Sequence, residues 1–195
     1  MKKNILLAVL LLGFQSAFAQ KSLLGLDENN RYIYYQVVDR PGLAADSLGK
    51  LALGFVTSSF ANKKEKSAND SSIKVRAYFE TYSALAFAKH ESGRITFELS
   101  IECRNNKYRY WITDFVFTPY ERDRYGMFVP VVGKDVALEN AKIKLDKKEL
   151  EGYLDQTGTY CQDIGTRLKL YMQLDHHSKI KGSPDQSKKI VTKNW

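Results

Sequence analysis

Strict alternation of apolar and polar residues marks the clearest element of the chain. Apolar residues occupy every second position of 95–103, and threonine, glutamate and serine fill the positions between them. A period of two is typical of a β-strand with one buried face. Asn105-Asn106 follows, and asparagine tolerates the backbone conformations of a two-residue hairpin turn. We therefore expect a hairpin whose second strand runs over 107–118.

The two-residue turn also determines which residues of the two strands lie opposite each other. On the apolar face it pairs Cys103–Tyr108, Ile101–Tyr110, Leu99–Ile112 and Ile95–Val116. On the other face it pairs Glu102 with Arg109, and such opposite charges stabilise a hairpin by roughly a few tenths of a kcal/mol. The same register places Asp114 on the apolar face opposite Phe97, where a carboxylate needs a partner or lies at the edge.

Three large aromatic residues are expected on the second face of this hairpin, beside one arginine. The four residues are Arg109, Trp111, Phe115 and Phe117. An open sheet face normally carries polar residues, so large aromatics there imply that something covers them. Two explanations remain open: residues 119–143 fold across this face, or the face binds a peptide, glycan or lipid.

The residues before this hairpin predict a strand, a helix and a further strand region. Residues 32–38 are rich in aromatic and β-branched residues, as strands are. Apolar residues then recur with helical spacing over 48–60. Residues 61–72 are polar and lack a period, so we expect a loop there. Residues 73–82 and 84–89 are expected to form one bent strand or two.

After the hairpin, the sequence predicts a long loop and then a long helix. Residues 119–143 show no clear period and are expected to form a loop, with a short helix at 138–142. Asp146, with Glu149 three residues later, is typical of a helix start. One apolar stripe then continues for about six or seven helical turns. Together these elements predict a single α+β domain over residues 20–174.

The first nineteen residues have the pattern of a secretory signal peptide. Lys2 and Lys3 precede a short apolar run, which ends in Ala17-Phe18-Ala19. This order is typical of a cleavable leader, and the run falls short of the ~20 apolar residues of a membrane-spanning helix. We therefore expect export to the periplasm or beyond after cleavage following Ala19, with no transmembrane span in the mature chain.

The distribution of charged residues predicts a basic C-terminal tail. The formal net charge of the chain is +8, and it falls to +6 without residues 1–19, which hold two lysines and no acidic residue. Residues 175–195 hold five lysines against two aspartates and show no apolar period, so we expect a solvated flexible tail. Contact of this tail with anionic lipid or polysaccharide is the alternative.

Two segments of the hairpin resemble a known family. They are Gly-Arg-Ile-Thr-Phe-Glu-Leu-Ser-Ile-Glu-Cys at 93–103 and Lys-Tyr-Arg-Tyr-Trp-Ile-Thr-Asp-Phe at 107–115. They are similar to a secreted bacterial family of domains of unknown function with a TBP-like fold, whose opening the strand at 32–38 also resembles. The resemblance implies a curved antiparallel sheet with helices packed on one face. It implies no activity and no catalytic residues, and the fold name does not imply nucleic-acid binding.

Candidate chemistry is sparse. The sequence contains none of the common catalytic, nucleotide-binding or zinc-binding motifs. We expect no metal and no cofactor, because His90 and the pair His176-His177 lack ligand spacing. Cys103 and Cys161 both fall on expected core faces. They are either two buried thiols or one disulfide, which would stabilise the fold by roughly 4 kcal/mol.

These observations favour a non-catalytic binding or interaction module of the cell envelope that uses the sheet face around Trp111. Its partner is expected to be an envelope protein, a glycan or a lipid, and not nucleic acid. Two alternatives stay open. One is a hydrolase built from scattered polar residues such as Asp114, Glu98 and Arg109, which a pocket of buried groups with shifted pKa values would favour. The other is a structural module completed by a second copy, which would bury Trp111 and Phe115 between copies.

Overall fold

The computed structural model describes residues 23–61, 65–69, 72–83, 90–143 and 145–174 of the 195-residue chain. These ranges include the whole of the hairpin predicted at 95–118 and the helix predicted after Asp146. The expected leader, the expected tail with its histidine pair, and the strand expected at 84–89 lie outside the described residues.

The described residues form an eight-stranded sheet in which every neighbouring pair of strands is antiparallel. The strands are β1 (Gly25–Leu26), β2 (Tyr32–Asp39), β3 (Glu65–Asn69), β4 (Ser72–Tyr82), β5 (Glu91–Arg104), β6 (Lys107–Arg122), β7 (Phe128–Pro130) and β8 (Val136–Ala137). Six of them follow the order β1-β2-β6-β5-β4-β3, and the short strands β7 and β8 both pair with β6. The loop predicted at 61–72 includes β3, so that prediction was wrong in part.

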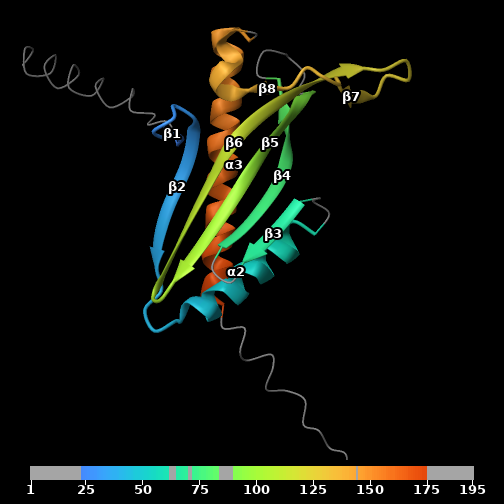
Figure 1. The fold of residues 1–195 in the computed structure, drawn as a ribbon. Helices are drawn as coiled ribbons and strands as arrows, with labels where there is room; N and C mark the ends of the chain where they lie inside the picture. The colour runs from blue at the N-terminus through green and yellow to red at the C-terminus, as the bar shows by residue number, and fades with distance from the viewer. Residues whose placement is uncertain (1–22, 62–64, 70–71, 84–89, 144, 175–195) are drawn as a thin grey trace, which may run out of the picture.

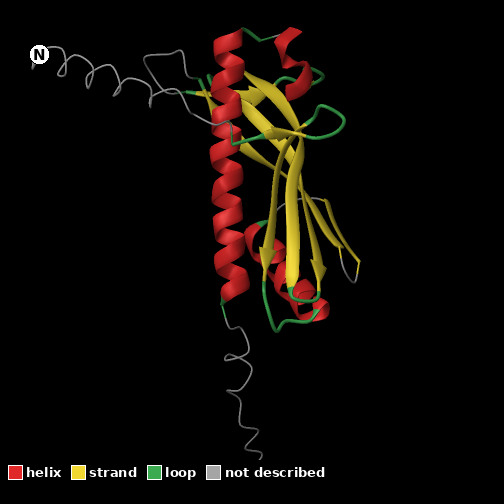
Figure 2. Ribbon diagram, turned by 90° about the vertical axis from the view of Figure 1, so that its left-hand side faces the viewer, coloured by secondary structure: helices red, strands yellow, loops and turns green. Residues whose placement is uncertain are grey.

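Two long helices cover one face of the sheet, and no described element covers the other face (Figures 1 and 2). The helices are α2 (Ala45–Ser59) and α3 (Lys147–Gln173), and a short 3-10 helix, η2 (Leu138–Ile143), precedes α3. Asp146 caps α3 as predicted, because its Oδ1 accepts a hydrogen bond of 2.9 Å from the N–H of Glu149. An antiparallel sheet with helices on one face confirms the predicted α+β class.

Helix α2 receives its N-terminal cap from a distant part of the chain. Ala44 precedes the helix and offers no side-chain cap. Instead, Oδ1 of Asn105 accepts a hydrogen bond of 2.9 Å from the N–H of Ala45, and Oδ1 of Asn106 accepts one of 2.8 Å from Gly42. Asn106 has a φ of 66°, the left-handed conformation that a two-residue hairpin turn favours. The predicted turn is confirmed, and its asparagines also hold the connection between β2 and α2.

Both helices pack on the apolar face of β5 and β6. The five alternating apolar residues of 95–103 are all buried, as predicted. The helices contribute Leu48, Ala52, Phe55 and Val56 from α2 and Leu150, Tyr153, Cys161, Ile164, Leu168 and Met172 from α3. Gly165 brings α3 close to the sheet, because a Cβ at that position would collide with the hydroxyl of the buried Tyr110. The core is therefore a single layer between one sheet face and two helices.

The predicted hairpin register holds from the turn as far as Glu98, which pairs with Thr113, and fails beyond it. Cys103 pairs with Tyr108 and Leu99 with Ile112, as predicted, but Ile95 pairs with Phe117 rather than Val116. A β-bulge causes the shift: two residues of β6, Asp114 and Phe115, lie opposite the single residue Phe97 of β5. Asp114 has a φ of 55°, so it loops out of the ladder in a left-handed conformation. Its predicted place on the apolar face was wrong.

The bulge carries two predicted site residues into the core. Phe115 and Phe117 were expected on the open side of the hairpin, and both are buried on the helix side. Phe117 stacks on Tyr153 of α3, with ring centroids 4.5 Å apart. Because Asp114 takes up one extra position, every later side chain of β6 changes face relative to the prediction. Phe115 and Phe117 therefore belong to the packing of the fold.

The long loop predicted at 119–143 is largely ordered structure. Strand β6 continues to Arg122, β7 and β8 return along it, and η2 matches the predicted short helix. Leu138 and Ala141 reach the core. This segment extends the sheet at the end of β6 that lies farthest from the hairpin turn, so it does not fold across Arg109 and Trp111 (Figure 1).

Candidate functional site

The face of the sheet that points away from α2 and α3, which we call the open face, exposes apolar side chains on two neighbouring strands. On β2, Tyr35 and Val37 have 47% and 52% of their surface accessible. On β6, Trp111 lies opposite Tyr35, and Arg109 lies opposite Val37. Tyr78 of β4 is also exposed, on the far side of β5. Of the four site residues predicted from the sequence, Arg109 and Trp111 lie on this face.

Tyr35 and Val37 were missed by the sequence analysis. Their strand is apolar on both faces, because Tyr34 is buried on the helix side while Tyr35 is exposed. Alternation therefore gives no signal that would assign one face to solvent. The pairing of β2 with β6 is what brings Tyr35 and Val37 beside Trp111, and that pairing joins segments far apart in the chain.

Arg109 is held over the ring of Trp111 by a salt bridge. Its Nη2 lies 2.6 Å and its Nε 2.8 Å from Oε2 of Glu102, the residue opposite it on β5. The guanidinium carbon lies 5.4 Å from the centroid of the Trp111 ring, which is a cation–π distance. The hydrogen bond to Glu102 raises the pKa of Arg109 above its ordinary value, and Tyr35 adds to the shift. The side chain is thus fixed and remains charged.

A shallow depression lies beside this pair, at the hairpin end of the open face. Its volume is about 160 Å³, and it is lined by Tyr35, Val37, Glu102, Arg104, Lys107, Tyr108 and Arg109. Three of these side chains are cationic and one is anionic, so the depression favours an acidic group. Pockets that enclose a small molecule are usually about 300–1,000 Å³. The depression is thus a contact point within a larger surface rather than a cleft.

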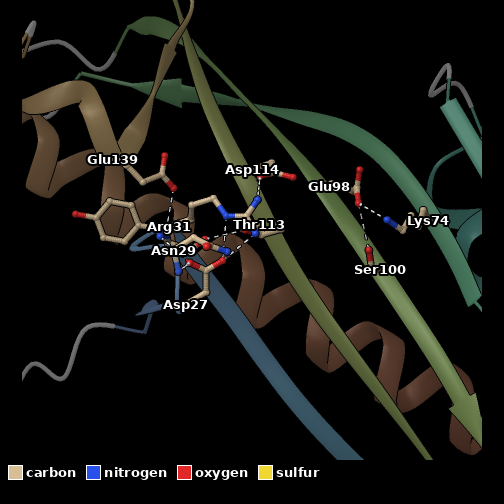
Figure 3. A network of polar contacts seen from close by, with 10 residues as sticks. Asp27, Asn29, Arg31, Lys74, Glu98, Ser100, Thr113, Asp114 and Glu139 are labelled. Atoms are coloured by element: carbon tan, nitrogen blue, oxygen red, sulfur yellow. Dashed lines mark hydrogen bonds and ion pairs between the residues drawn. The ribbon is translucent and has the colours of Figure 1, made fainter.

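The centre of the open face carries a second ion pair (Figure 3). Nζ of Lys74 lies 3.3 Å from Oε1 of Glu98, and the hydroxyl of Ser100 donates to the same oxygen at 3.4 Å. Ser100 is completely buried, although no described helix covers this side of the sheet. Long side chains from β4 and β5 therefore lie across the surface and shield the strand beneath them.

The far end of the open face contains incompletely satisfied polar groups. The guanidinium of Arg94 lies 5.2 Å from the ring of Tyr78. Among the described residues, Nε of Arg94 and Oε2 of Glu80 are buried and have no hydrogen-bond partner. Burial raises the pKa of Tyr120, and its hydrogen bond to Glu80 raises it further. Buried polar atoms without a partner are uncommon, and water or a bound group would lower their energy.

Asp114 lies in a separate polar network at the β-bulge (Figure 3). Nη1 of Arg31 lies 2.9 Å from Oδ1 of Asp114, and Nη2 of Arg31 lies 2.9 Å from Oδ2 of Asp27. The hydrogen bond from the N–H of Arg31 is the largest cause that lowers the pKa of Asp27. The looped-out carboxylate thus ties the β1–β2 turn to β6.

The three residues of the hydrolase alternative are held in three different ion pairs. Asp114 pairs with Arg31, Glu98 with Lys74 and Arg109 with Glu102. Only Arg109 lines the depression. Across the described residues, no group of three His, Cys, Asp or Glu side chains is placed to hold a metal ion, and no helix is long and apolar enough to span a bilayer. The geometry gives this alternative no support.

The two cysteines are both buried and do not form the disulfide that the sequence left open. Burial raises the pKa of the Cys103 thiol to about 11 and that of Cys161 further above its usual value. A thiol that stays protonated in an apolar environment is a poor nucleophile. Both residues therefore act as packing groups.

Tyr108, whose side chain is buried on the helix side of β6, makes stability depend on pH in the alkaline range. Burial raises its pKa from 10.0 to about 12, and among the described residues its hydroxyl has no hydrogen-bond partner. The folded state favours the neutral phenol, so its contribution is complete below pH 10 and is lost as the pH rises towards 12. A pKa that is two units higher in the folded state than in the unfolded state corresponds to about 3 kcal/mol in the free energy of unfolding.

We expect Tyr108→Phe to raise the free energy of unfolding by up to about 1 kcal/mol at neutral pH, because it removes an unpaired buried hydroxyl. The variant should also lose less stability than the wild type as the pH rises from 10 to 12. Urea unfolding at a series of pH values measures both effects. Tyr125→Phe, at an exposed tyrosine, is the matched control and should follow the wild type. If Tyr108→Phe and the wild type lost the same free energy of unfolding between pH 10 and pH 12, this account would be contradicted.

Residues 34–118 match one family model, which is described as a domain of unknown function (DUF4468) with TBP-like fold. This part of the chain is similar to DUF4468 domains. The match confirms the resemblance drawn from the hairpin segments. It runs from β2 to near the end of β6, so the matched region includes Tyr35, Arg109 and Trp111 of the open face.

Two solved structures have the same fold as this chain. A TBP-like protein from Parabacteroides distasonis ATCC 8503 matches with a TM-score of 0.61 and 14% identity, over 77% of this chain and 97% of that chain. A DUF4468 family protein from Bacteroides ovatus ATCC 8483 matches with a TM-score of 0.57 and 11% identity, over 85% of this chain and 94% of that chain. No curated protein matches the chain. At these identities the likeness establishes the TBP-like fold and nothing about activity.

Proposed function

We propose that this protein is a non-catalytic interaction module that binds a partner protein through its open face. The observation that carries the proposal is the group of accessible Tyr35 and Val37 beside the fixed Arg109–Trp111 pair, on a face that no described helix covers. Tyrosine, tryptophan and arginine are the residues most enriched at the energetic centres of protein interfaces. Strand pairing already orders the backbone beneath these side chains, so binding costs no backbone freedom there.

The surroundings of this group support a protein partner over an enclosed small molecule. The depression beside it is about 160 Å³, too small to enclose a ligand of ordinary size. The Lys74–Glu98 and Arg109–Glu102 pairs place charges around the aromatic group, as in the polar rim of an interface. Because Arg104 and Lys107 line the depression, the partner is expected to present an acidic side chain there.

The leader at 1–19 supports a partner outside the cytoplasm. A basic start, a short apolar run and an Ala-Phe-Ala end are the features of a cleavable signal peptide. The proposed place of action is therefore the cell envelope or the medium.

Site-specific photocrosslinking in the cells that produce the protein tests the proposal. A benzophenone amino acid at Val37 should give a discrete adduct, because this position lies within the proposed interface. Leu53 of α2 is the matched control: 42% of its surface is accessible, against 52% for Val37, and α2 covers the opposite face. Replacing Trp111 with alanine should reduce the adduct at position 37 at least tenfold, while stability changes by less than about 2 kcal/mol.

The mass of the adduct identifies the kind of partner. A foreign protein supports the proposal, whereas an adduct of twice the mass of the chain indicates a second copy and moves the proposal to self-association. Among the described residues, β1 pairs only with Tyr32 and Ile33, so the outer edge of β2 from Tyr34 onward is unpaired and offers such a copy a pairing site. The same adduct at positions 37 and 53, or none at position 37, would refute the proposal.

A further inference from the structure

The outer edge of β2, on the side away from β6, is left open for most of its length. Strand β1 pairs only with the first two residues of β2. From Tyr34 to Asp39 no described strand pairs with this edge, and Figure 1 shows β2 at the border of the sheet. The open-face residues Tyr35 and Val37 belong to this run, so the edge borders the proposed interface.

The pairing of β2 with β6 determines which backbone groups of β2 point to the free edge. The N–H of Arg40 donates to the carbonyl of Asn106, in the turn before β6, at 2.6 Å. The carbonyl of Tyr32 accepts a hydrogen bond of 3.1 Å from the hydroxyl of Thr113 in β6. In an antiparallel sheet, residues that bond to one neighbouring strand alternate with residues that point to the other side. Even-numbered residues of β2 therefore bond to β6.

The odd-numbered residues of the run point their backbone groups outward, and they are Tyr35, Val37 and Asp39. Among the described residues, their three N–H and three carbonyl groups have no backbone partner. Natural proteins commonly protect such an edge with lysine, proline or a bulge, which prevents a further strand from adding.

The edge of β2 lacks these protections, whereas the opposite edge of the sheet carries charge. The run from 34 to 39 is Tyr-Tyr-Gln-Val-Val-Asp, with neither lysine nor proline, and its pairing with β6 shows no register shift. At the other edge, β3 is Glu-Lys-Ser-Ala-Asn, with two charged residues among five. The edge of β2 is thus the one that permits a further strand.

We propose that an extended, acidic segment of the partner protein adds to the sheet as a strand at this edge. The inference rests on the proposed function and names the form in which the partner binds. Alternating N–H and carbonyl groups in one line are matched by the backbone of another extended chain, and about five residues would pair with all six groups. The side chains of the segment would then alternate between the open face, beside Val37, and the helix side, beside Gln36.

The charges at the hairpin end of this edge favour an acidic segment. The depression beside Val37 is lined by three cationic side chains and one anionic one. The run itself adds Asp39, and Arg40 follows it directly. Cationic side chains therefore outnumber acidic ones by four to two, and among the described residues Arg104 and Lys107 form no ion pair. An aspartate or glutamate of the segment would complement this charge.

A second copy of the chain fits this edge less well than a short segment of another protein. In the antiparallel register that places Val37 of both copies opposite each other, Pro41 of one copy comes opposite Ile33 of the other. Gly25 already occupies that place, because it pairs with Ile33. Other registers pair fewer of the outward groups. A segment of another protein can end before it reaches β1.

Photocrosslinking on both sides of β2 tests this inference in the full chain, in the cells that produce it. A benzophenone amino acid at Gln36 probes the helix side, whereas one at Val37 probes the open face. A strand added at the edge lies beside both positions, so we expect the same adduct from both. Digestion and mass spectrometry should map both crosslinks to one partner segment of about five residues that includes aspartate or glutamate. Leu53 of α2 is again the control and should give no adduct.

A matched pair of variants isolates the outward N–H of Asp39. Asp39→Pro removes this N–H, and proline is tolerated where the N–H of an edge strand faces solvent. This variant should lower the adduct at position 36 at least fivefold. Asp39→Ala removes the same side chain but keeps the N–H, so it should retain at least half of the adduct. Urea unfolding verifies that both variants fold, and the crosslink map decides the question if Asp39→Pro does not.

The results separate this inference from the proposed function. No adduct at position 37 refutes both. An adduct at 37 that Trp111→Ala reduces, with none at 36, supports the proposed function and overturns strand addition. Strand addition by a partner is also overturned by equal yields from Asp39→Pro and Asp39→Ala, by an adduct at 36 of twice the mass of the chain, or by a crosslink from 36 within the same chain.

Discussion

Replacing Phe115 with alanine is expected to lower the free energy of unfolding by about 3–5 kcal/mol. The side chain has no accessible surface and lies on the helix side of β6, directly after the bulge at Asp114. Removing it leaves a cavity in the single core layer between the sheet and the two helices. Urea denaturation followed by circular dichroism measures the loss.

The control for this prediction is Trp111→Ala, only four residues earlier on the same strand. Trp111 is partly exposed on the open face, so its removal should cost less than about 2 kcal/mol while it weakens partner binding at least tenfold. The two variants therefore separate stability from function. If Phe115→Ala folded as stably as the wild type and lost binding instead, Phe115 would lie on the open face, and the β-bulge at Asp114 would be assigned incorrectly.

Replacing Gly93 with alanine should cost about 3 kcal/mol or more, although only one methyl group is added. A Cβ at position 93 would lie 2.5 Å from the backbone carbonyl oxygen of Thr118 and 2.6 Å from the ring of Phe117. The backbone oxygen belongs to β6 and the ring is buried, so neither can move without disturbing the sheet. Glycine is the residue that permits such a close approach of two strands. Chemical denaturation measures the loss in the free energy of unfolding, and near-ultraviolet circular dichroism reports the packing of the aromatic core.

Gly25→Ala is the matched control, since Gly25 also lies in a strand and faces a carbonyl oxygen. There the nearest atom, the backbone oxygen of Ile33, is 3.8 Å away, which is ordinary van der Waals contact. This variant should change stability by less than about 1 kcal/mol. Equal effects of the two substitutions would mean that the general cost of replacing a strand glycine, and not crowding at Gly93, sets the loss.

Much of the fold could be predicted from the chain because the strongest patterns are local. The alternation in 95–103 and the Asn105-Asn106 turn define the hairpin, and Asp146 with the stripe after it defines α3. The bulge could not be predicted. Residues 107–117 place aromatic residues on both faces of a regular strand, so one looped-out residue leaves no visible break in the pattern.

The same bulge explains why only two of the four predicted site residues lie on the open face. Arg109 and Trp111 lie before the bulge, where the register derived from the turn holds. Phe115 and Phe117 lie after it, and Asp114 moves both of them to the other face. Tyr35 and Val37 join the site through pairing between β2 and β6, which depends on the whole sheet and is not encoded in the local period of either strand.

The cap that Asn105 gives to α2 links two events in the assembly of the chain. The acceptor and the first helical N–H are 60 positions apart, so the helix lacks this hydrogen bond until the tip of the β5–β6 hairpin has formed and come back to it. Starting a helix is costly for an isolated segment. A fully capped α2 should therefore appear only after the β5–β6 hairpin has formed, so the start of this helix depends on a contact that is distant in the sequence.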